Sequence, residues 1–201
     1  MPDVIFLRHG QSQWNLENKF TGWVDVPLSE RGIVEARRAG EKLRGRVVDH
    51  LFTSVLQRAI ETARIAFDVA GLTDVPTTRD AALNERMYGD LQGLDKDAAR
   101  ARWGEEQVHV WRRSYDVPPP GGESLADTAA RVVPYWEQTI LPLVRAGKNV
   151  VIAAHGNSLR ALAMHLEGLS REQVLALEIP TGVPILYRLS TDGRLEHKET
   201  L

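Results

Sequence analysis

The chain has 201 residues, of which 43% are hydrophobic and 26% charged. This composition is typical of a globular protein in water, and the length fits one domain over residues 1–201 better than two independently folding units. The formal net charge of -2 provides no overall field that would attract nucleic acid or an anionic membrane, so any anion-binding site must be local.

The absence of cysteine and of apolar targeting segments bears on where the protein works. Without cysteine there are no disulfides and no thiolate metal sites, which suits a reducing compartment. The opening residues MPDVIFLRHG lack the features of a signal peptide, and no run approaches the ~18 apolar residues of a membrane span. We therefore expect a cytoplasmic protein that has neither a membrane nor a nucleic acid as partner.

The first half of the chain predicts two repeats of a strand followed by a helix. The apolar run at residues 4–7 stops abruptly at a polar segment, as a buried strand does. Apolar positions then recur at helical spacing over residues 29–45, where Ser29 is suited to an N-cap and Gly45 to a stop signal. Residues 50–54 predict a second strand, and residues 56–71 a second amphipathic helix.

The second half predicts a third repeat after a turn. The segment Pro-Pro-Pro-Gly-Gly at 118–122 predicts a surface loop. Residues 150–154 predict a buried strand that runs into a helix carrying Leu159, Leu162 and Leu166, and residues 183–189 predict a late strand. Alternating strands and helices with nearly continuous apolar strands predict an α/β fold, a three-layer sandwich with a mostly parallel central sheet and helices on both faces.

Two predicted strands end in a histidine followed by a glycine, Arg8-His9-Gly10 and His155-Gly156. Ligands of such sheets bind beyond the carboxyl ends of the strands, so these residues are candidates for one crevice. A neutral imidazole is a competent nucleophile, and a guanidinium grips phosphoryl oxygens. A buried structural histidine is the alternative for His9 taken alone, and a solvated helix surface is the alternative for Arg58, a third candidate cation.

Six segments, in order along nearly the whole chain, resemble the 2,3-bisphosphoglycerate-dependent phosphoglycerate mutases of the histidine phosphatase superfamily. They are RHGQSQWN at 8–15, FTGW at 20–23, SVLQRA at 54–59, LNERMYG and LQG within 83–93, WRRSY at 111–115, and the stretch from 153 to 162. The resemblance implies the glycolytic and gluconeogenic interconversion of 2-phosphoglycerate and 3-phosphoglycerate. It also implies a phosphohistidine intermediate, 2,3-bisphosphoglycerate as the priming phosphoryl donor, and no metal.

The resemblance also implies a role for each matching residue. His9 would carry the phosphoryl group, His155, Arg8 and Arg58 would clamp it in flight, and Glu85 would be the general acid and base. The residues that would line the substrate and phosphate site are Gly10, Ser12, Asn15, Thr21, Gly22, Arg86, Tyr88, Lys96, Arg112, Arg113, Gly156 and Asn157. Phosphoryl transfer needs an in-line nucleophile, positive charge around three oxygens, and a proton donor for the hydroxyl, which these residue types supply.

Two other functions are left open, and the chain departs from the family in two places. A phosphatase of the same superfamily would pass the phosphoryl group from His9 to water, and a non-catalytic protein would only bind phospholigands. The stretch after the proline turn is shorter than in many members, which leaves a homo-oligomer possible but undetermined. The segment after the last predicted strand, residues 195–201, is also short, so we expect more phosphatase activity relative to mutase activity than in long-tailed relatives.

Overall fold

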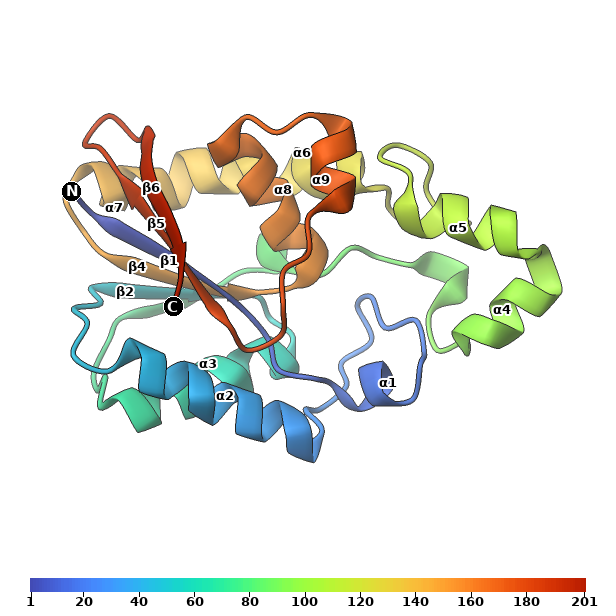
Figure 1. The fold of residues 1–201 in the computed structure, drawn as a ribbon, viewed down its shortest axis with the longest axis horizontal. Helices are drawn as coiled ribbons and strands as arrows, with labels where there is room; N and C mark the ends of the chain where they lie inside the picture. Colours follow the sequence, from blue (N-terminus) through green and yellow to red (C-terminus); the bar gives the residue numbers. More distant parts are fainter.

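The computed structural model describes residues 1–201, and its centre is a six-stranded sheet with the strand order β3-β2-β4-β1-β5-β6 (Figure 1). Strands β3, β2, β4 and β1 run parallel to one another, whereas β5 pairs antiparallel with β1, and β6 with β5. The predicted α/β fold with a mostly parallel sheet is confirmed. The strands are β1 (Asp3–Arg8), β2 (His50–Thr53), β3 (Thr77–Arg79), β4 (Val150–Ala154), β5 (Pro184–Leu189) and β6 (Leu195–Thr200).

Helices cover both faces of the sheet: α2 and α3 lie on one face, and α6, α7 and α8 on the other (Figure 1). A π-helical turn at Trp136–Ile140 joins α6 to α7, and short 3-10 turns occupy Ala81–Leu83 and Gly89–Leu91. No helix has the length and apolar character that would let it span a membrane. The helices are α1 (Gln13–Leu16), α2 (Glu30–Leu43), α3 (Gln57–Ala70), α4 (Lys96–Trp103), α5 (Glu105–Arg113), α6 (Leu125–Tyr135), α7 (Leu141–Arg145), α8 (Gly156–Glu167) and α9 (Arg171–Ala176).

The continuous apolar run of β1 is explained by helices on both faces. Side chains alternate between the faces of a strand, and Val4 and Phe6 pack into the core beneath α6 and α8. Ile5 and Leu7 pack into the second core, beneath α2 and α3. All four are buried, so each of these four positions of the strand must be apolar.

The predicted helix over residues 29–45 is α2, and its ends follow the expected signals. The Ser29 side chain accepts the Gly32 N–H, which caps the first turn. The helix ends at Leu43, and Gly45 follows with a φ of 74°, a conformation that glycine adopts without steric cost. Ala36, Gly40 and Leu43, three of the positions at helical spacing, are buried against the sheet and α3.

Residues 195–200 differ from the expectation of a tail after the last strand, because they form β6. This strand pairs with β5 through Ile185 and Thr200, Leu186 and Glu199, and the following positions. Its residues after Leu195 are exposed and polar, so the strand lacks the apolar alternation that reveals a buried strand in a sequence.

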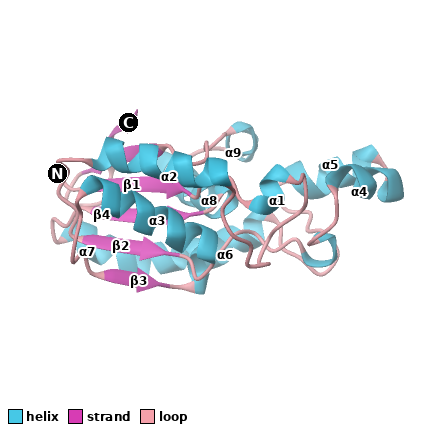
Figure 2. Ribbon diagram, turned by 90° about the horizontal axis from the view of Figure 1, so that it is seen from below, coloured by secondary structure: helices cyan, strands magenta, loops and turns pink.

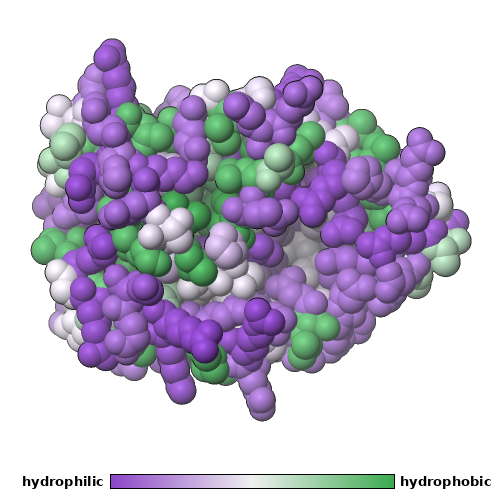
Figure 3. Space-filling view, in the orientation of Figure 1, coloured by the Kyte–Doolittle hydropathy of each residue, from purple (hydrophilic) through white to green (hydrophobic).

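The helices α4 and α5 form a lobe that projects from the sandwich (Figure 2). The lobe has a small core of its own, in which Phe20 from the N-terminal segment packs with Leu91, Ala99, Val108 and Trp111. Between the lobe and the carboxyl ends of the parallel strands lies a recess bordered by hydrophilic side chains (Figure 3).

Candidate active site

The neighbouring parallel strands β1 and β4 bring two histidines together at the edge of the sheet. Arg8 pairs with Ala154 in the register of these strands, and the His9 N–H donates to the Ala154 carbonyl oxygen at 3.0 Å. His155 directly follows β4, and the ring centroids of His9 and His155 lie 5.0 Å apart. Both rings are buried, with 2% of His9 and none of His155 exposed. The convergence expected from two strand ends is therefore present.

His9 is held in the form that can act as a nucleophile. Its Nδ1 lies 2.6 Å from the Gly10 carbonyl oxygen, which can only accept a hydrogen bond, so Nδ1 carries the hydrogen. The lone pair is then on Nε2. Burial, followed by the charges of Arg58 and Arg8, lowers the pKa of His9 well below its usual value. The ring is consequently neutral at physiological pH, as nucleophilic attack requires.

Two arginines beside His9 are fixed by backbone carbonyl groups. Arg58, in the first turn of α3, donates from Nη2 to the Gly22 oxygen at 2.6 Å and from Nη1 to the Val24 oxygen at 3.0 Å. Burial lowers its pKa to about 10, so the guanidinium is still charged at neutral pH. Arg8 donates from Nη1 to the Ile179 oxygen at 2.8 Å, while its buried Nε has no partner in the protein.

His155 adds a hydrogen-bond donor next to these cations. Its Nε2 lies 2.7 Å from Ser54 Oγ, which accepts the Leu56 N–H and can give its own hydrogen to the ring. That arrangement places a hydrogen on the buried Nδ1, which has no partner in the protein. An unpartnered buried donor is costly, and a phosphoryl oxygen would satisfy both this atom and Arg8 Nε.

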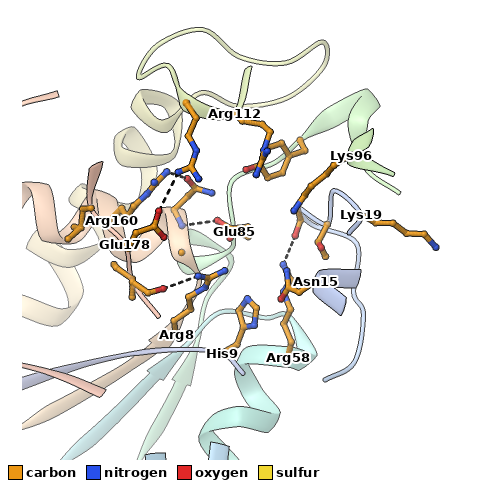
Figure 4. Close-up of a pocket in the computed structure, with 18 residues that line it drawn as sticks. Arg8, His9, Asn15, Lys19, Arg58, Glu85, Lys96, Arg112, Arg160 and Glu178 are labelled. Atoms are coloured by element: carbon orange, nitrogen blue, oxygen red, sulfur yellow. Dashed lines mark hydrogen bonds and ion pairs between the residues drawn. The ribbon is translucent and has the colours of Figure 1, made fainter. Parts of the chain in front are cut away.

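Glu85 points into the same cavity with one carboxylate oxygen fixed and the other free (Figure 4). Oε1 accepts the Arg86 N–H at 2.8 Å and the Asn157 N–H, at the start of α8, at 3.1 Å. The side chain is only 8% exposed, and no protein group donates to Oε2. A carboxylate held in this way presents Oε2 for proton exchange with a bound hydroxyl group.

The α4–α5 lobe supplies cations on the side of the cavity opposite His9 (Figure 4). Lys96 begins α4, while Arg112 and Arg113 lie in the last turn of α5. Burial, with a further contribution from Arg112, lowers the pKa of Lys96 to about 8, and burial also lowers the pKa of Arg112. The cavity of about 190 Å³ therefore has positive charge on two sides, which suits a small ligand with more than one anionic group.

Most of the residues predicted for the site line this cavity. Three others, His155, Gly10 and Ser12, are not in the lining: the His155 ring lies beside that of His9, Gly10 approaches the Gly32 carbonyl so closely that a Cβ would collide with it, and Ser12 caps α1. Arg86 is buried and donates to the carbonyl oxygens of Glu123 and Trp111. The predicted residues in the lining are Arg8, His9, Asn15, Thr21, Gly22, Arg58, Glu85, Tyr88, Lys96, Arg112, Arg113, Gly156 and Asn157.

Several lining residues were not expected from the sequence: Lys19, Arg160 and residues 177–179. Arg160 is 8% exposed, and its Nη2 donates to Asn157 Oδ1 at 2.6 Å. Helical spacing could have revealed it, because Arg160 lies four residues after Gly156 on the same face of α8. Residues 177–179 follow α9 in an irregular segment, for which the sequence has no comparable signal.

No group of three or more His, Cys, Asp or Glu side chains is arranged to hold a metal ion, and independence from metals stays a prediction. A nucleophilic imidazole surrounded by cations, with a carboxylate across the cavity, is the arrangement needed to move a phosphoryl group through a histidine. The fold and the site thus place the chain in the class of proteins that transfer phosphoryl groups through a histidine. Residues 4–196 match the histidine phosphatase superfamily (branch 1), and the chain belongs to this family.

Curated relatives of high similarity extend over nearly the whole chain. A protein of Beijerinckia indica is 58% identical over 200 residues, covering 98% of this chain and 97% of the relative. A protein of a Bradyrhizobium species is 59% identical over 197 residues, covering 97% and 95%. Both are named 2,3-bisphosphoglycerate-dependent phosphoglycerate mutase. The resemblance drawn from the six sequence segments is thereby confirmed.

Solved structures share the fold at lower identity. A mycobacterial glucosyl-3-phosphoglycerate phosphatase, determined with VO3, is 28% identical and has a TM-score of 0.84, covering 98% of this chain and 97% of that one. YhfR of Bacillus stearothermophilus is 25% identical with a TM-score of 0.86, covering 98% and 95%. The architecture is thus shared with a phosphatase, whereas the more similar sequences are mutases.

Proposed function

We propose that this chain is an enzyme that interconverts 2-phosphoglycerate and 3-phosphoglycerate, with His9 as the carrier of the phosphoryl group. The observation that carries this proposal is the neutral, buried imidazole of His9, whose Nδ1 is hydrogen-bonded to the Gly10 carbonyl oxygen. This imidazole lies in the same cavity as Glu85 and the cations of the lobe. The names of relatives that are 58% and 59% identical support the same activity.

In the transfer step, Nε2 of His9 attacks phosphorus while the bond from phosphorus to the glycerate oxygen breaks. Arg8, Arg58 and His155 stabilise the charge on the three equatorial oxygens, which is the main demand of phosphoryl transfer. Glu85, as a carboxylic acid, gives its proton to the departing oxygen. In the reverse step, the Glu85 carboxylate takes a proton from the hydroxyl group that attacks phosphorus on His9.

The charge of the cavity fits 2,3-bisphosphoglycerate, which the names of the relatives imply as the primer. When bound, this molecule supplies the phosphoryl group that charges His9. Cations on both sides of the cavity would hold its two phosphates and its carboxylate, with Arg8 and Arg58 near His9 and Arg112 and Lys96 in the lobe. The unpartnered nitrogen Nε of Arg8 supports the same fit, because it needs an acceptor.

A phosphatase is the second candidate function, favoured by the shared fold with a glucosyl-3-phosphoglycerate phosphatase. It would use the same His9 but release the phosphoryl group to water. Binding of phospholigands without transfer is the third. Location in the cytoplasm and a single domain remain predictions from sequence.

Labelled 2,3-bisphosphoglycerate tests these alternatives directly. The enzyme is mixed with the label in EDTA, acid-labile label is sought on His9, and unlabelled monophosphoglycerate is added as a chase. A mutase transfers the label to the chase substrate, a phosphatase releases it as inorganic phosphate, and a binding protein is never labelled. His9→Gln should abolish labelling, while the matched control His109→Gln, at an exposed position of α5, should not. Labelling that is seen without EDTA and lost when EDTA is present would contradict metal independence.

A further inference from the structure

Arg131, on α6, donates to the backbone carbonyl groups of the loop that carries Glu85. Its Nη1 donates to the oxygens of Ala82 at 2.8 Å and Asn84 at 3.0 Å, and its Nη2 donates to the Glu85 oxygen at 2.8 Å. The side chain is 21% exposed. A planar guanidinium can contact three carbonyl groups of one loop, whereas a lysine ammonium on a flexible stem cannot reproduce that fixed geometry.

Glu123 balances the charge of Arg131 and ties the same loop at its other end. Its two carboxylate oxygens accept from Arg131 Nε and Nη2, both at 2.9 Å. Oε2 also accepts the Met87 N–H at 3.0 Å. The ion pair therefore holds the chain on both sides of Glu85, from residue 82 to residue 87.

Trp23 is a second donor to the Glu85 backbone. Its indole Nε1 donates to the Glu85 carbonyl oxygen at 2.6 Å, and its ring lies under the Arg131 guanidinium, 5.4 Å from the ring centroid. The preceding residue, Gly22, accepts a hydrogen bond from Arg58. The carbonyl group of Glu85 is thus fixed by two donors from segments remote in sequence, one of which adjoins the residues that hold Arg58.

These contacts fix the backbone from which the Glu85 carboxylate extends into the cavity. Arg131 does not line the cavity, and its guanidinium donates to the Glu85 loop and to Glu123. We propose that Arg131, together with Trp23, is a positioning residue for the proton-transfer step, acting by fixing the backbone of Glu85. This inference rests on the proposed function. It predicts that loss of the guanidinium geometry impairs proton transfer and leaves the attack of His9 intact.

The two kinds of phosphoryl donor separate these effects. With 2,3-bisphosphoglycerate the departing oxygen is an alkoxide, which must receive a proton from Glu85 as the His9 Nε2–phosphorus bond forms. With 4-nitrophenyl phosphate the same bond forms, but the departing 4-nitrophenolate is a weak base that leaves without a proton. A displaced carboxyl group should therefore slow only the first reaction.

The test uses Arg131→Lys, which keeps the charge beside Glu123, in single-turnover experiments with enzyme in excess. We expect label transfer from 2,3-bisphosphoglycerate to His9 to fall by about 10- to 100-fold, with its Kd unchanged, while nitrophenolate release stays within about twofold of wild type. An equal loss with both donors would show general damage to the site and would overturn the proposal. Unchanged rates with both donors would also overturn it.

Three further variants make the result specific. Glu85→Gln should slow transfer from 2,3-bisphosphoglycerate even more than Arg131→Lys does, again without slowing nitrophenolate release. Trp23→Phe removes one hydrogen bond to the Glu85 carbonyl but keeps an aromatic ring, so it should show a smaller difference between the two phosphoryl donors. This variant keeps the test valid even if Arg131→Lys fails to fold. Arg64→Lys is the matched control, because Arg64 pairs only with Glu61 on the exposed face of α3. If the wild-type enzyme takes no phosphoryl group from 2,3-bisphosphoglycerate, the proposed function fails. If the wild-type enzyme does take it, but Trp23→Phe and Arg131→Lys show no difference between the two phosphoryl donors, only the positioning role fails.

Discussion

Acid should destabilise this protein through the two buried histidines of the site. Burial is the largest cause that lowers the pKa of both His9 and His155, and the nearby guanidinium of Arg58 is the next. In the unfolded chain both imidazoles return to an ordinary pKa of about 6.5. The unfolded state thus binds protons that the folded state does not. Stability is unaffected well above pH ~6.5 and is lost as the pH falls below it.

The size of the effect follows from proton linkage. For an imidazole that stays neutral in the folded state, unfolding becomes more favourable by RT ln(1 + 10^(pKa − pH)), with the pKa of the unfolded chain. Between pH ~7.5 and pH ~5.5 this amounts to a little over about 1 kcal/mol for each ring and to about 3 kcal/mol for His9 and His155 together. A loss of that size is a large fraction of the roughly 5–15 kcal/mol by which domains are stable.

Urea unfolding at several pH values measures this loss. The double variant His9→Gln/His155→Gln should lose about 3 kcal/mol less than wild type over the same pH interval, whatever its starting stability. His197→Gln, at an exposed position of β6, is the control and should follow wild type. Buffers must be free of phosphate, because anion binding would add stability of its own. Equal pH dependence in wild type and the double variant would refute the assignment of neutral, buried imidazoles.

Three further predictions concern the cations and the loop that holds them. Gly22→Ala should lower the free energy of unfolding by about 1–2 kcal/mol, measured with urea, because the φ of Gly22 is 58° and a Cβ would collide with Gln92 Oε1. Arg58→Lys should lower kcat/KM by about 100-fold in a coupled assay, since lysine cannot make the paired contacts of the guanidinium; a loss below about threefold would contradict its role. Salt between ~10 mM and ~150 mM should lower kcat/KM for phosphoglycerate, and Arg112→Gln/Arg113→Gln should reduce that dependence; equal slopes would exclude steering by the lobe.

The sequence alone determined the elements whose burial is local and periodic. The apolar runs of β1 and β4 and the helical spacing of α2 and α3 are visible because each strand or helix buries a regular set of positions. The sequence also predicted that His9 and His155 lie close together, because neighbouring parallel strands end at the same edge of a sheet. The long matching segments then indicated Glu85, whose residue type by itself favours a surface position.

Elements without a periodic apolar pattern were determined only by the tertiary structure. Strand β6 consists largely of exposed polar residues, and its partner β5 runs antiparallel to β1, a direction that an apolar run does not reveal. The contribution of Arg160 and of residues 177–179 to the cavity depends on how α8 and the segment after α9 pack against the sheet.

The same distinction applies to the residues that hold the site in place. Arg86 belongs to a matching segment, yet its guanidinium donates to the carbonyl oxygens of Trp111 and Glu123, which lie far along the chain. Arg131 is an ordinary helical arginine in the sequence, and only its hydrogen bonds to Ala82, Asn84 and Glu85 give it a role. A sequence records which side chains carry charge or hydrogen-bond donors. Which distant carbonyl group each donor meets is decided by packing, because that partner lies tens of residues away and leaves no local pattern.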